Sequence, residues 1–336
     1  MTKCKSALIF LILSILITTS CADKGSLTQS RLIMDTVVTI QIGHQNRAIA
    51  RKALGRAFDK IEQLASSLNR HNEKSEISLI NQAGNKRPIA VSNETEAILR
   101  RAVSLSDLTQ GAFDVTIQPL TSLWREYESK ELMPPEREIR KALRKVGYKN
   151  IDIRQAGRIR LRKRGMKLDL SAIAKGYIVD QAVATLRDYG IESGLVDAGG
   201  DIYCFGSSEE KDDWKIGVKH PRNEFLLGSI RLSEKAIATS GDYERNFKIN
   251  GKKYSHILDP RTGYPASHQA ISVTVIADDC MTADGLATAI SVIGLREGMD
   301  LVERLSGIEA VIITESANGS IAVAISSGLE EKYEAI

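Results

Sequence analysis

The sequence predicts an α+β fold in which one body combines mixed or antiparallel sheets with flanking helices. Helical and strand-like segments follow one another without the strand–helix–strand rhythm of a doubly wound parallel sheet. The chain has 336 residues, of which 43% are hydrophobic and 26% are charged, so it can enclose a sizeable apolar core. No internal repeat, low-complexity stretch or clear linker divides it.

Helices are predicted from apolar residues at helical spacing and from the signals at helix ends. In residues 46–68 apolar residues recur every three or four positions. Ser92 is a capping residue for a second helix, which stops at Gly111. Pro134 and Pro135 precede a third, which ends near residue 147. A short helix is expected near residues 79–80, and three more over residues 175–189, 281–293 and 295–305.

Strands are predicted where short β-branched or alternating runs lie between turn residues. The first covers residues 31–42, where apolar and polar residues alternate. Asn250-Gly251 and Asn318-Gly319 mark hairpin turns, because this dipeptide readily takes up the left-handed backbone of a tight turn. The other strands are expected over residues 151–153, 159–161, 195–205, 214–218, 225–232, 236–239, 245–249, 252–256, 271–277, 310–314 and 320–325.

The N-terminus has the features of an export signal. Lys3 and Lys5 precede an apolar run over residues 7–17, which is too short to anchor the chain across a bilayer. Small residues then lead to Cys21, a pattern that resembles a bacterial lipoprotein signal, although Thr18 stands where an aliphatic residue is usual. We therefore expect residues 1–20 to be removed, Cys21 to be lipidated and residues 21–30 to form a tether. The alternative is a plain signal peptide that ends near a cysteine.

Charge and cysteine content exclude some classes of protein. The formal net charge is +4, and removal of residues 1–20 takes away two lysines, so a mature charge of +2 does not indicate nucleic-acid binding. Cys204 and Cys280 remain in the mature domain, and their apolar surroundings predict buried thiols, although an exported protein can form a disulfide. With no CxxC motif or Cys/His cluster, zinc is not expected.

A helix that begins near residue 281 carries Asp284 and Thr288 on one face, because residues four apart lie one above the other. A carboxylate and a hydroxyl at that spacing suit Mg²⁺, which prefers oxygen ligands and completes its shell with carbonyls, water or phosphate. The alternative is that Asp284 only stabilises the helix start, which contributes roughly 0.3–1 kcal/mol.

Two loops could receive a phosphate group. Residues 167–180 pass from a strand end through small residues into a helix, where free backbone N–H groups and Lys175 could bind a phosphate. Otherwise Asp169 and Ser171 cap this helix and Lys175 is solvated. In the second loop, residues 197–201 (DAGGD), paired glycines between two acids permit a positive φ or a close backbone approach, although a plain tight turn also explains them.

His256 follows a strand and precedes the turn-rich segment Asp259-Pro260-Arg261-Thr262-Gly263. An imidazole in a loop can relay protons near neutral pH, although a lone histidine is more often structural. Residues 111–120 place Phe113 beside Asp114, with Thr116 expected on a strand. Phe113 offers an aromatic face to a ligand or, by default, belongs to the core.

The order of these motifs is more informative than any one of them. Along the chain come Met34-Asp35-Thr36, Phe113-Asp114-Val115-Thr116, LDLSAIAKGYIVD (168–180), DAGGD (197–201), ATSGDYER (238–245), YSHILDPRTGYP (254–265) and TADGLATA (282–289). The set closely resembles the ApbE family of bacterial FAD:protein FMN transferases, which are often exported lipoproteins. The resemblance implies a single ApbE-like, T-fold-like flavin transferase domain over residues 31–336.

The resemblance also implies a reaction and a site. The FMN moiety of FAD would pass through a phosphoester bond to a threonine hydroxyl of a partner protein, with Mg²⁺ required and AMP released. Asp284 and Thr288 would hold Mg²⁺ with the main-chain oxygen of Ala172. His256 would lie by the pyrophosphate and accept the hydroxyl proton in preference to Asp284, which is a poorer base when it binds a cation. FAD would also contact Met34, His71, Ala112, Phe113, Asp114, Asp169 and Lys175.

Three positions depart from the family pattern. Asp35 replaces a glycine and adds a charge near the expected flavin site, Gly285 replaces an alanine, and His71 stands where an aromatic residue is frequent. Two other functions therefore stay open beside the transferase. A hydrolase would use the same site to give FMN and AMP, and a non-enzymatic flavin-binding lipoprotein would hold FAD without turnover.

The resemblance places the protein and its partner outside the cytoplasm. An exported lipoprotein anchored through Cys21 would face the periplasm, or the extracytoplasmic side of the membrane. Its acceptor would be a flavoprotein subunit with a threonine flavinylation motif. NADH:quinone reductase-type and Rnf-type complexes contain such subunits.

Overall fold

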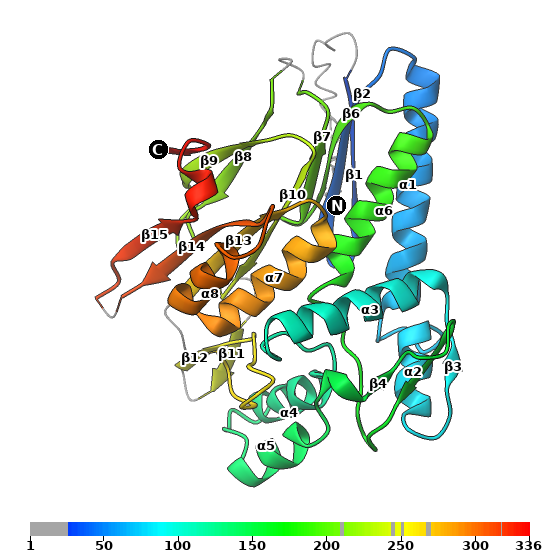
Figure 1. The fold of residues 1–336 in the computed structure, drawn as a ribbon, viewed down its shortest axis with the longest axis vertical. Helices are drawn as coiled ribbons and strands as arrows, with labels where there is room; N and C mark the ends of the chain where they lie inside the picture. The colour runs from blue at the N-terminus through cyan, green and yellow to red at the C-terminus, as the bar shows by residue number, and fades with distance from the viewer. Residues whose placement is uncertain (1–25, 209–211, 243–245, 250–251, 267–269, 317) are drawn as a thin grey trace, which may run out of the picture.

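An eight-stranded sheet forms the centre of the fold, shown in Figure 1. The structure, a computed structural model, describes residues 26–208, 212–242, 246–249, 252–266, 270–316 and 318–336. All neighbouring strands of this sheet are antiparallel, which confirms the expected α+β class. In spatial order they are β1 (Ser26–Ile33), β2 (Thr36–Gly43), β6 (Ser193–Ala198), β7 (Ile202–Phe205), β10 (Lys235–Gly241), β13 (Ala270–Ala277), β14 (Glu309–Glu315) and β15 (Ile321–Ile325).

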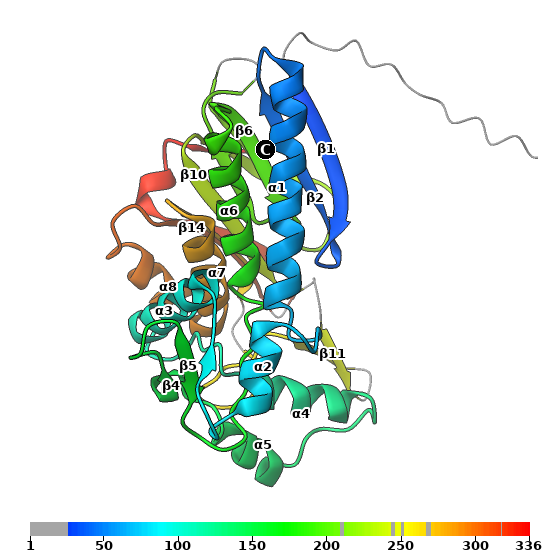
Figure 2. The same cartoon turned by 90° about the vertical axis from the view of Figure 1, so that its right-hand side faces the viewer.

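Three long helices cover one face of this sheet, and Figure 2 shows two of them side by side. They are α1 (Arg47–Leu68), α6 (Ala174–Asp188) and α7 (Cys280–Ile293), and α8 (Leu295–Val302) follows α7. Helix α1 forms because its apolar residues make one continuous buried stripe from Ala50 to Leu68. The Asn46 side chain begins this helix by accepting hydrogen bonds from the N–H groups of Ala48 and Ile49.

A small antiparallel sheet packs on the other face. It consists of β8 (Trp214–Lys219), β9 (Leu226–Leu232) and β16 (Tyr333–Ala335). Trp214, Ile216 and Ile230 form a second apolar cluster there with Val311 and with Cys204. Cys204 and Cys280 are both buried and free, which confirms the prediction of two thiols.

A mainly helical unit extends beyond one end of the large sheet (Figures 1 and 2). Its helices are α2 (Glu76–Ala83), α3 (Asn93–Leu108), α4 (Gln118–Glu128) and α5 (Glu136–Leu143), and a short 3-10 helix covers Tyr148–Asn150. A second 3-10 helix, Ser327–Leu329, lies near the C-terminus and is not part of this unit. Its strands are β3 (Ile89–Ala90), β4 (Ile151–Asp152) and β5 (Arg158–Leu161). The hairpin of β11 (Asn246–Ile249) and β12 (Lys252–Ser255) lies nearby, and Ile249 packs with Trp124 of α4. The predicted turn residues Asn250 and Gly251 lie outside the described residues.

The structure corrects several expectations about chain segments. The strands predicted over residues 31–42 and 195–205 are each a hairpin of two strands, β1 with β2 and β6 with β7. Residues 26–30 are not a tether, because β1 begins at Ser26 and pairs with β2 along its whole length. Thr116 is not on a strand either. Asp114 accepts hydrogen bonds from the backbone N–H and the hydroxyl of Thr116, which holds a turn, and α4 begins two residues later.

Helices α6 and α7 approach each other closely at their N-terminal ends. A Cβ atom at Gly176 would collide with the backbone of Cys280 and Met281, so only glycine fits this crossing. The Gly176 N–H donates to Asp284 Oδ2 at 3.2 Å, and this hydrogen bond links the start of α6 to the Asp284 side chain on α7. Among the described residues, no helix has the length and apolarity needed to cross a membrane.

Replacement of Gly176 by alanine is therefore expected to lower the free energy of unfolding by about 1–3 kcal/mol, because a backbone contact cannot relax around the added methyl group. The matched control is Gly55→Ala in α1, where a Cβ would have open space. This control should raise the stability by about 0.5–1 kcal/mol, since alanine is the better helix former. Urea unfolding of the two variants measures both changes in the free energy of unfolding. Equal changes for Gly176→Ala and Gly55→Ala would contradict the close contact between α6 and α7.

Candidate functional site

A buried acidic cluster lies where α6, α7 and the β6–β7 turn meet. Lys175, in the first turn of α6, places its Nζ 3.2 Å from Asp201 Oδ2. Asp201 is 1% exposed and Asp284 is 5% exposed, and their carboxyl groups are in hydrogen-bond contact. Burial raises the pKa of Asp201 in spite of the nearby ammonium group. Two buried carboxyl groups in contact need a shared proton or a bound cation.

One oxygen of this cluster has no hydrogen-bond donor among the described residues. Asp201 Oδ2 is buried, and Lys175 Nζ lies at ion-pair distance from it. Buried carboxylate oxygens are normally hydrogen-bonded, so the charge of Lys175 is what compensates this oxygen within the protein.

The other candidate ligands supply further oxygen atoms. Thr288 lies one turn after Asp284, and its hydroxyl is 3.2 Å from the hydroxyl of Ser240 on β10. In the described part of the chain no N–H donates to the Ala172 carbonyl, because the Gly176 N–H turns to Asp284 instead. Among the described residues, no three His, Cys, Asp or Glu side chains are arranged to hold a metal ion together. The available donors are one or two carboxylates, a hydroxyl and a carbonyl, and such oxygen donors are of the kind that Mg²⁺ takes together with substrate phosphate.

The Met34-Asp35 turn lies against the loop that carries Asp201. Ile33 and Thr36 are paired, and the two residues between them have φ values of 58° and 60°. This geometry is that of a two-residue hairpin turn of type I′, which Asp tolerates better than most residues. A Cβ at Gly199 would collide with Thr36, so the glycine allows the hairpin tip to contact the β6–β7 turn.

Asp169 is fixed by an ion pair rather than by helix capping. Arg70 Nη1 lies 2.9 Å from Asp169 Oδ2, and the Ser171 N–H donates to Asp169 Oδ1. The alternative that Asp169 and Ser171 cap α6 is wrong, because that helix has no side-chain cap, and Lys175 is ion-paired rather than solvated. The pair brings the loop with exposed His71 to the segment that precedes α6.

The stretch Ala112-Phe113-Asp114 is buried. The Asp114 carboxylate accepts hydrogen bonds from Thr116 and from the backbone of Tyr148, and burial raises its pKa. Phe113 belongs to the main core. Ala112 packs with Ile257, the neighbour of His256, so the stretch lies near the candidate base. Its contact with FAD stays a prediction, and its side chains are already engaged in packing.

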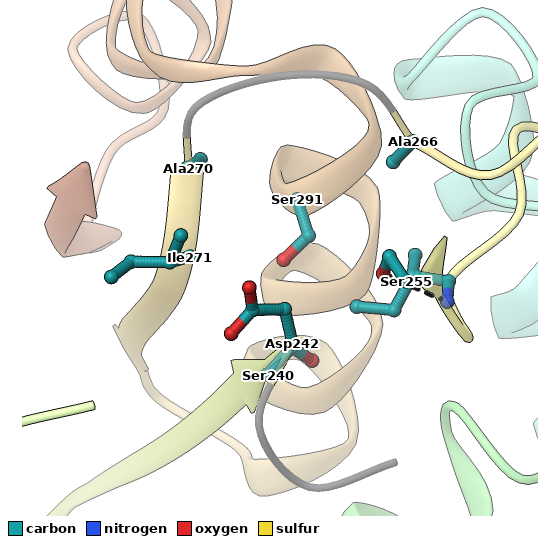
Figure 3. Close-up of a pocket in the computed structure, with 8 residues that line it drawn as sticks. Ser240, Asp242, Ser255, Ala266, Ala270, Ile271 and Ser291 are labelled. Atoms are coloured by element: carbon teal, nitrogen blue, oxygen red, sulfur yellow. Dashed lines mark hydrogen bonds between the residues drawn. The ribbon is translucent and has the colours of Figure 1, made fainter. Parts of the chain in front are cut away.

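His256 follows β12 and is half-buried. Its neighbours Ser255 and Ile257 line a cavity of about 120 Å³, shown in Figure 3. Ser240, the partner of Thr288, lines the same cavity, which therefore connects the segment around His256 with Thr288 of α7. Another lining residue, Asp242, is held by Arg222 through two hydrogen bonds of 2.7 and 2.9 Å.

Sequence reasoning missed four residues that the fold adds to this site. Asp201 and Ser240 lie in the DAGGD and ATSGDYER motifs, so a signal for both was present. Arg70 and Arg222 belong to no motif, and only their ion pairs with Asp169 and Asp242 connect them to the site.

The fold is that of solved flavin transferases. The crystal structure of the ApbE protein of Thermotoga maritima is 34% identical in sequence, with a TM-score of 0.81 over 91% of this chain and 99% of that one. The flavin transferase ApbE from Vibrio cholerae is 30% identical, with a TM-score of 0.79 and the same coverage. The fold therefore defines the class of the protein as that of the flavin transferases.

Sequence comparison then gives the family. The curated FAD:protein FMN transferase of Vibrio cholerae is 33% identical over 291 residues, which are 85% of this chain and 86% of the relative. That of Klebsiella pneumoniae is 30% identical over 298 residues, or 88% and 91% of the two chains. The ApbE family model matches residues 34–312. The chain belongs to the ApbE family.

Replacement of Arg70 by methionine is expected to lower the free energy of unfolding by about 3 kcal/mol, because it leaves the buried Asp169 carboxylate without its cation. The exposed Arg296 of α8 provides the control, and Arg296→Met should change stability by less than about 0.5 kcal/mol. Urea unfolding measures both variants. If Arg70→Met behaved like the control, the ion pair would not be what fixes this loop.

Proposed function

We propose that the protein is a Mg²⁺-dependent FAD:protein FMN transferase that attaches the FMN moiety of FAD to a threonine hydroxyl of a partner and releases AMP. The observation that supports it most is the contact between the buried carboxyl groups of Asp201 and Asp284 beside Lys175, where α6, α7 and the β6–β7 turn meet. Two curated relatives that match 85% and 88% of this chain are named FAD:protein FMN transferases.

The residues of the cluster divide the work of phosphoryl-group transfer. Asp284, Thr288 and the carbonyl of Ala172 would hold Mg²⁺, which supplies charge neutralisation at the pyrophosphate oxygens. Lys175 adds a positive charge beside Asp201 and would bind a phosphate oxygen electrostatically. We assign FAD contacts to Asp169, His71 and Met34 as well.

The transfer step balances without any oxidant or reductant. The threonine oxygen attacks the phosphorus of the FMN half, a new phosphoester bond forms, and the pyrophosphate bond to AMP breaks. His256 takes the hydroxyl proton, a role worth roughly 10²–10⁴-fold in rate. Asp284 is the poorer base, because its Oδ2 already accepts the Gly176 N–H and its charge is needed for the cation.

The acceptor is expected on the extracytoplasmic side. The lipoprotein-like signal supports lipidation of Cys21 and a membrane anchor, although residues 1–25 lie outside the described residues. A partner that meets such an enzyme is an exported or membrane-embedded flavoprotein subunit, as in NADH:quinone reductase-type or Rnf-type complexes.

The test is incubation of residues 22–336 with FAD and Mg²⁺, with and without an acceptor domain that contains the threonine motif. We expect the acceptor to gain the mass of one FMN moiety, AMP to appear in equal amount, and EDTA to stop both. Free FMN and AMP without labelling would instead show a hydrolase. FAD retained without turnover would show a flavin carrier.

In this assay Asp284→Ala should lower Mg²⁺-dependent turnover by at least about 100-fold, because the cation loses its charged ligand. The control is Asp300→Ala on α8, whose exposed carboxylate lies outside the site. Both rates are followed by AMP release over a Mg²⁺ titration. Full activity of Asp284→Ala would remove the metal assignment.

His256→Ala should slow transfer by roughly 10²–10⁴-fold and leave FAD affinity largely unchanged, because a general base acts on the attacking hydroxyl rather than on bound FAD. Quenching of flavin fluorescence gives the affinity, and acceptor mass gives the rate. His44→Ala, at the loop before α1, serves as the control. Loss of FAD binding in His256→Ala would make this histidine a ligand contact and place the base elsewhere.

A further inference from the structure

The contacts between α6 and α7 assign a role to a residue that the proposed reaction does not use. We propose that Asp180 is a positioning residue, which fixes the N-terminal turn of α7 so that Asp284 and Thr288 face their cation. This inference rests on the proposed function, because it takes these two residues as the Mg²⁺ ligands.

Asp180 binds the first turn of α7 with both carboxylate oxygens. Its Oδ1 accepts the N–H of Cys280 at 2.7 Å, and its Oδ2 accepts the N–H of Met281 at 2.9 Å. Helix N-termini leave such N–H groups without partners inside the helix. Asp279 satisfies the next one, from Thr282, but Asp279 belongs to the same chain segment. Arg101 of α3 reaches the same turn from another side, where it donates to the Thr282 hydroxyl. The bond pair from Asp180 is the contact that holds the backbone of this turn to α6.

A second contact on the same face of α6 reaches the cation ligand itself. Gly176 lies one turn before Asp180, and its N–H donates to Asp284 Oδ2. Two residues of α6 at a spacing of four thus hold α7 at its first turn and at its metal-binding carboxylate. Because the Cys280 and Met281 N–H groups both point out of the N-terminal end of α7 but lie at different positions around the helix axis, a bidentate acceptor fixes both the position and the rotation of α7.

The surroundings of Asp180 make this link sensitive to protonation. Burial raises the pKa of Asp180 to about 7, with the charges of Asp279 and Asp201 acting in the same direction and the two backbone N–H groups opposing them. The phenols of Tyr177 and Tyr203 and the Cys280 thiol also face it, and their pKa values are raised, so they are neutral near pH 7. A protonated Asp180 keeps one good acceptor for two donors.

The test uses residues 22–336 and Mg²⁺ alone, with binding measured by calorimetry and by the shift of the melting temperature. Asp180→Asn is isosteric and removes one acceptor, so Mg²⁺ should bind about 10–100-fold more weakly, the usual cost of losing a group that orients a metal ligand. Asp180→Glu restores the charge and both acceptors and should recover part of the affinity. The control is Asp188→Asn at the exposed end of the same helix.

The pH dependence of Mg²⁺ affinity is a second measurement, and a simple loss of stability would not change it. In the wild type, Mg²⁺ affinity should fall as the pH drops through about 7, because Asp180 gains a proton there. Asp180→Asn carries no charge to titrate at that position, so this step should be absent from its profile. An identical profile for the two proteins would overturn the positioning role.

The outcomes separate this inference from the proposed function. If Asp284→Ala loses Mg²⁺ binding and Asp180→Asn matches the wild type, the positioning role is wrong and the metal assignment stands. If Asp284→Ala binds Mg²⁺ as the wild type does, both are wrong. Should the Asp180 variants not fold, hydrogen exchange in the wild type decides: Mg²⁺ should slow exchange of the Cys280 and Met281 amides, and unchanged exchange would overturn the proposal.

Discussion

The close crossing of α6 and α7 is the constraint on which the candidate site depends. Gly176 allows the two backbones to approach, and its N–H holds the Asp284 carboxylate. Three acids, Asp180, Asp201 and Asp284, collect around this point with Lys175 as the cation that pairs with Asp201. The N-terminal ends of both helices add partial positive charge, which favours this concentration of carboxylates. The crossing thus creates a buried place where carboxyl groups lie together, and it is there that we propose the divalent cation binds.

The strand ends and turns of the large sheet position the other residues of the candidate site beside the α6–α7 crossing. The β6–β7 turn presents Asp201, the end of β10 presents Ser240, and the tip of the β1–β2 hairpin rests on Gly199. These three segments are far apart in sequence, but antiparallel pairing brings their ends to one side of the sheet. A turn residue such as Gly199 therefore has two functions, because it closes a hairpin and lets a second hairpin contact it.

Much of the fold follows from local patterns in the sequence. Helix α1 was predictable because its apolar stripe is long and regular, and the Asp284–Thr288 pair was predictable because helical spacing alone places both on one face. Local patterns gave wrong predictions where a contact with a distant residue determines the secondary structure. The polar segment of β1 is a strand because β2 pairs with it. Helix α4 was not predicted, because the segment before it forms a turn around Asp114 that the sequence pattern did not indicate. Asp180 acts on α7 from 100 residues away, which no spacing rule reveals.

The Asp35 position shows how such constraints limit a change at the site. A residue with a side chain at positive φ costs roughly 1–2 kcal/mol relative to glycine, and Asp is among the residues that tolerate it best. Ile33 and Thr36 remain paired, so the hairpin keeps the backbone path that a glycine would allow. Asp35 is exposed, and its charge therefore stays in water instead of entering the acidic cluster. The substitution changes the rim of the candidate site, while the buried Asp201–Asp284 contact is untouched.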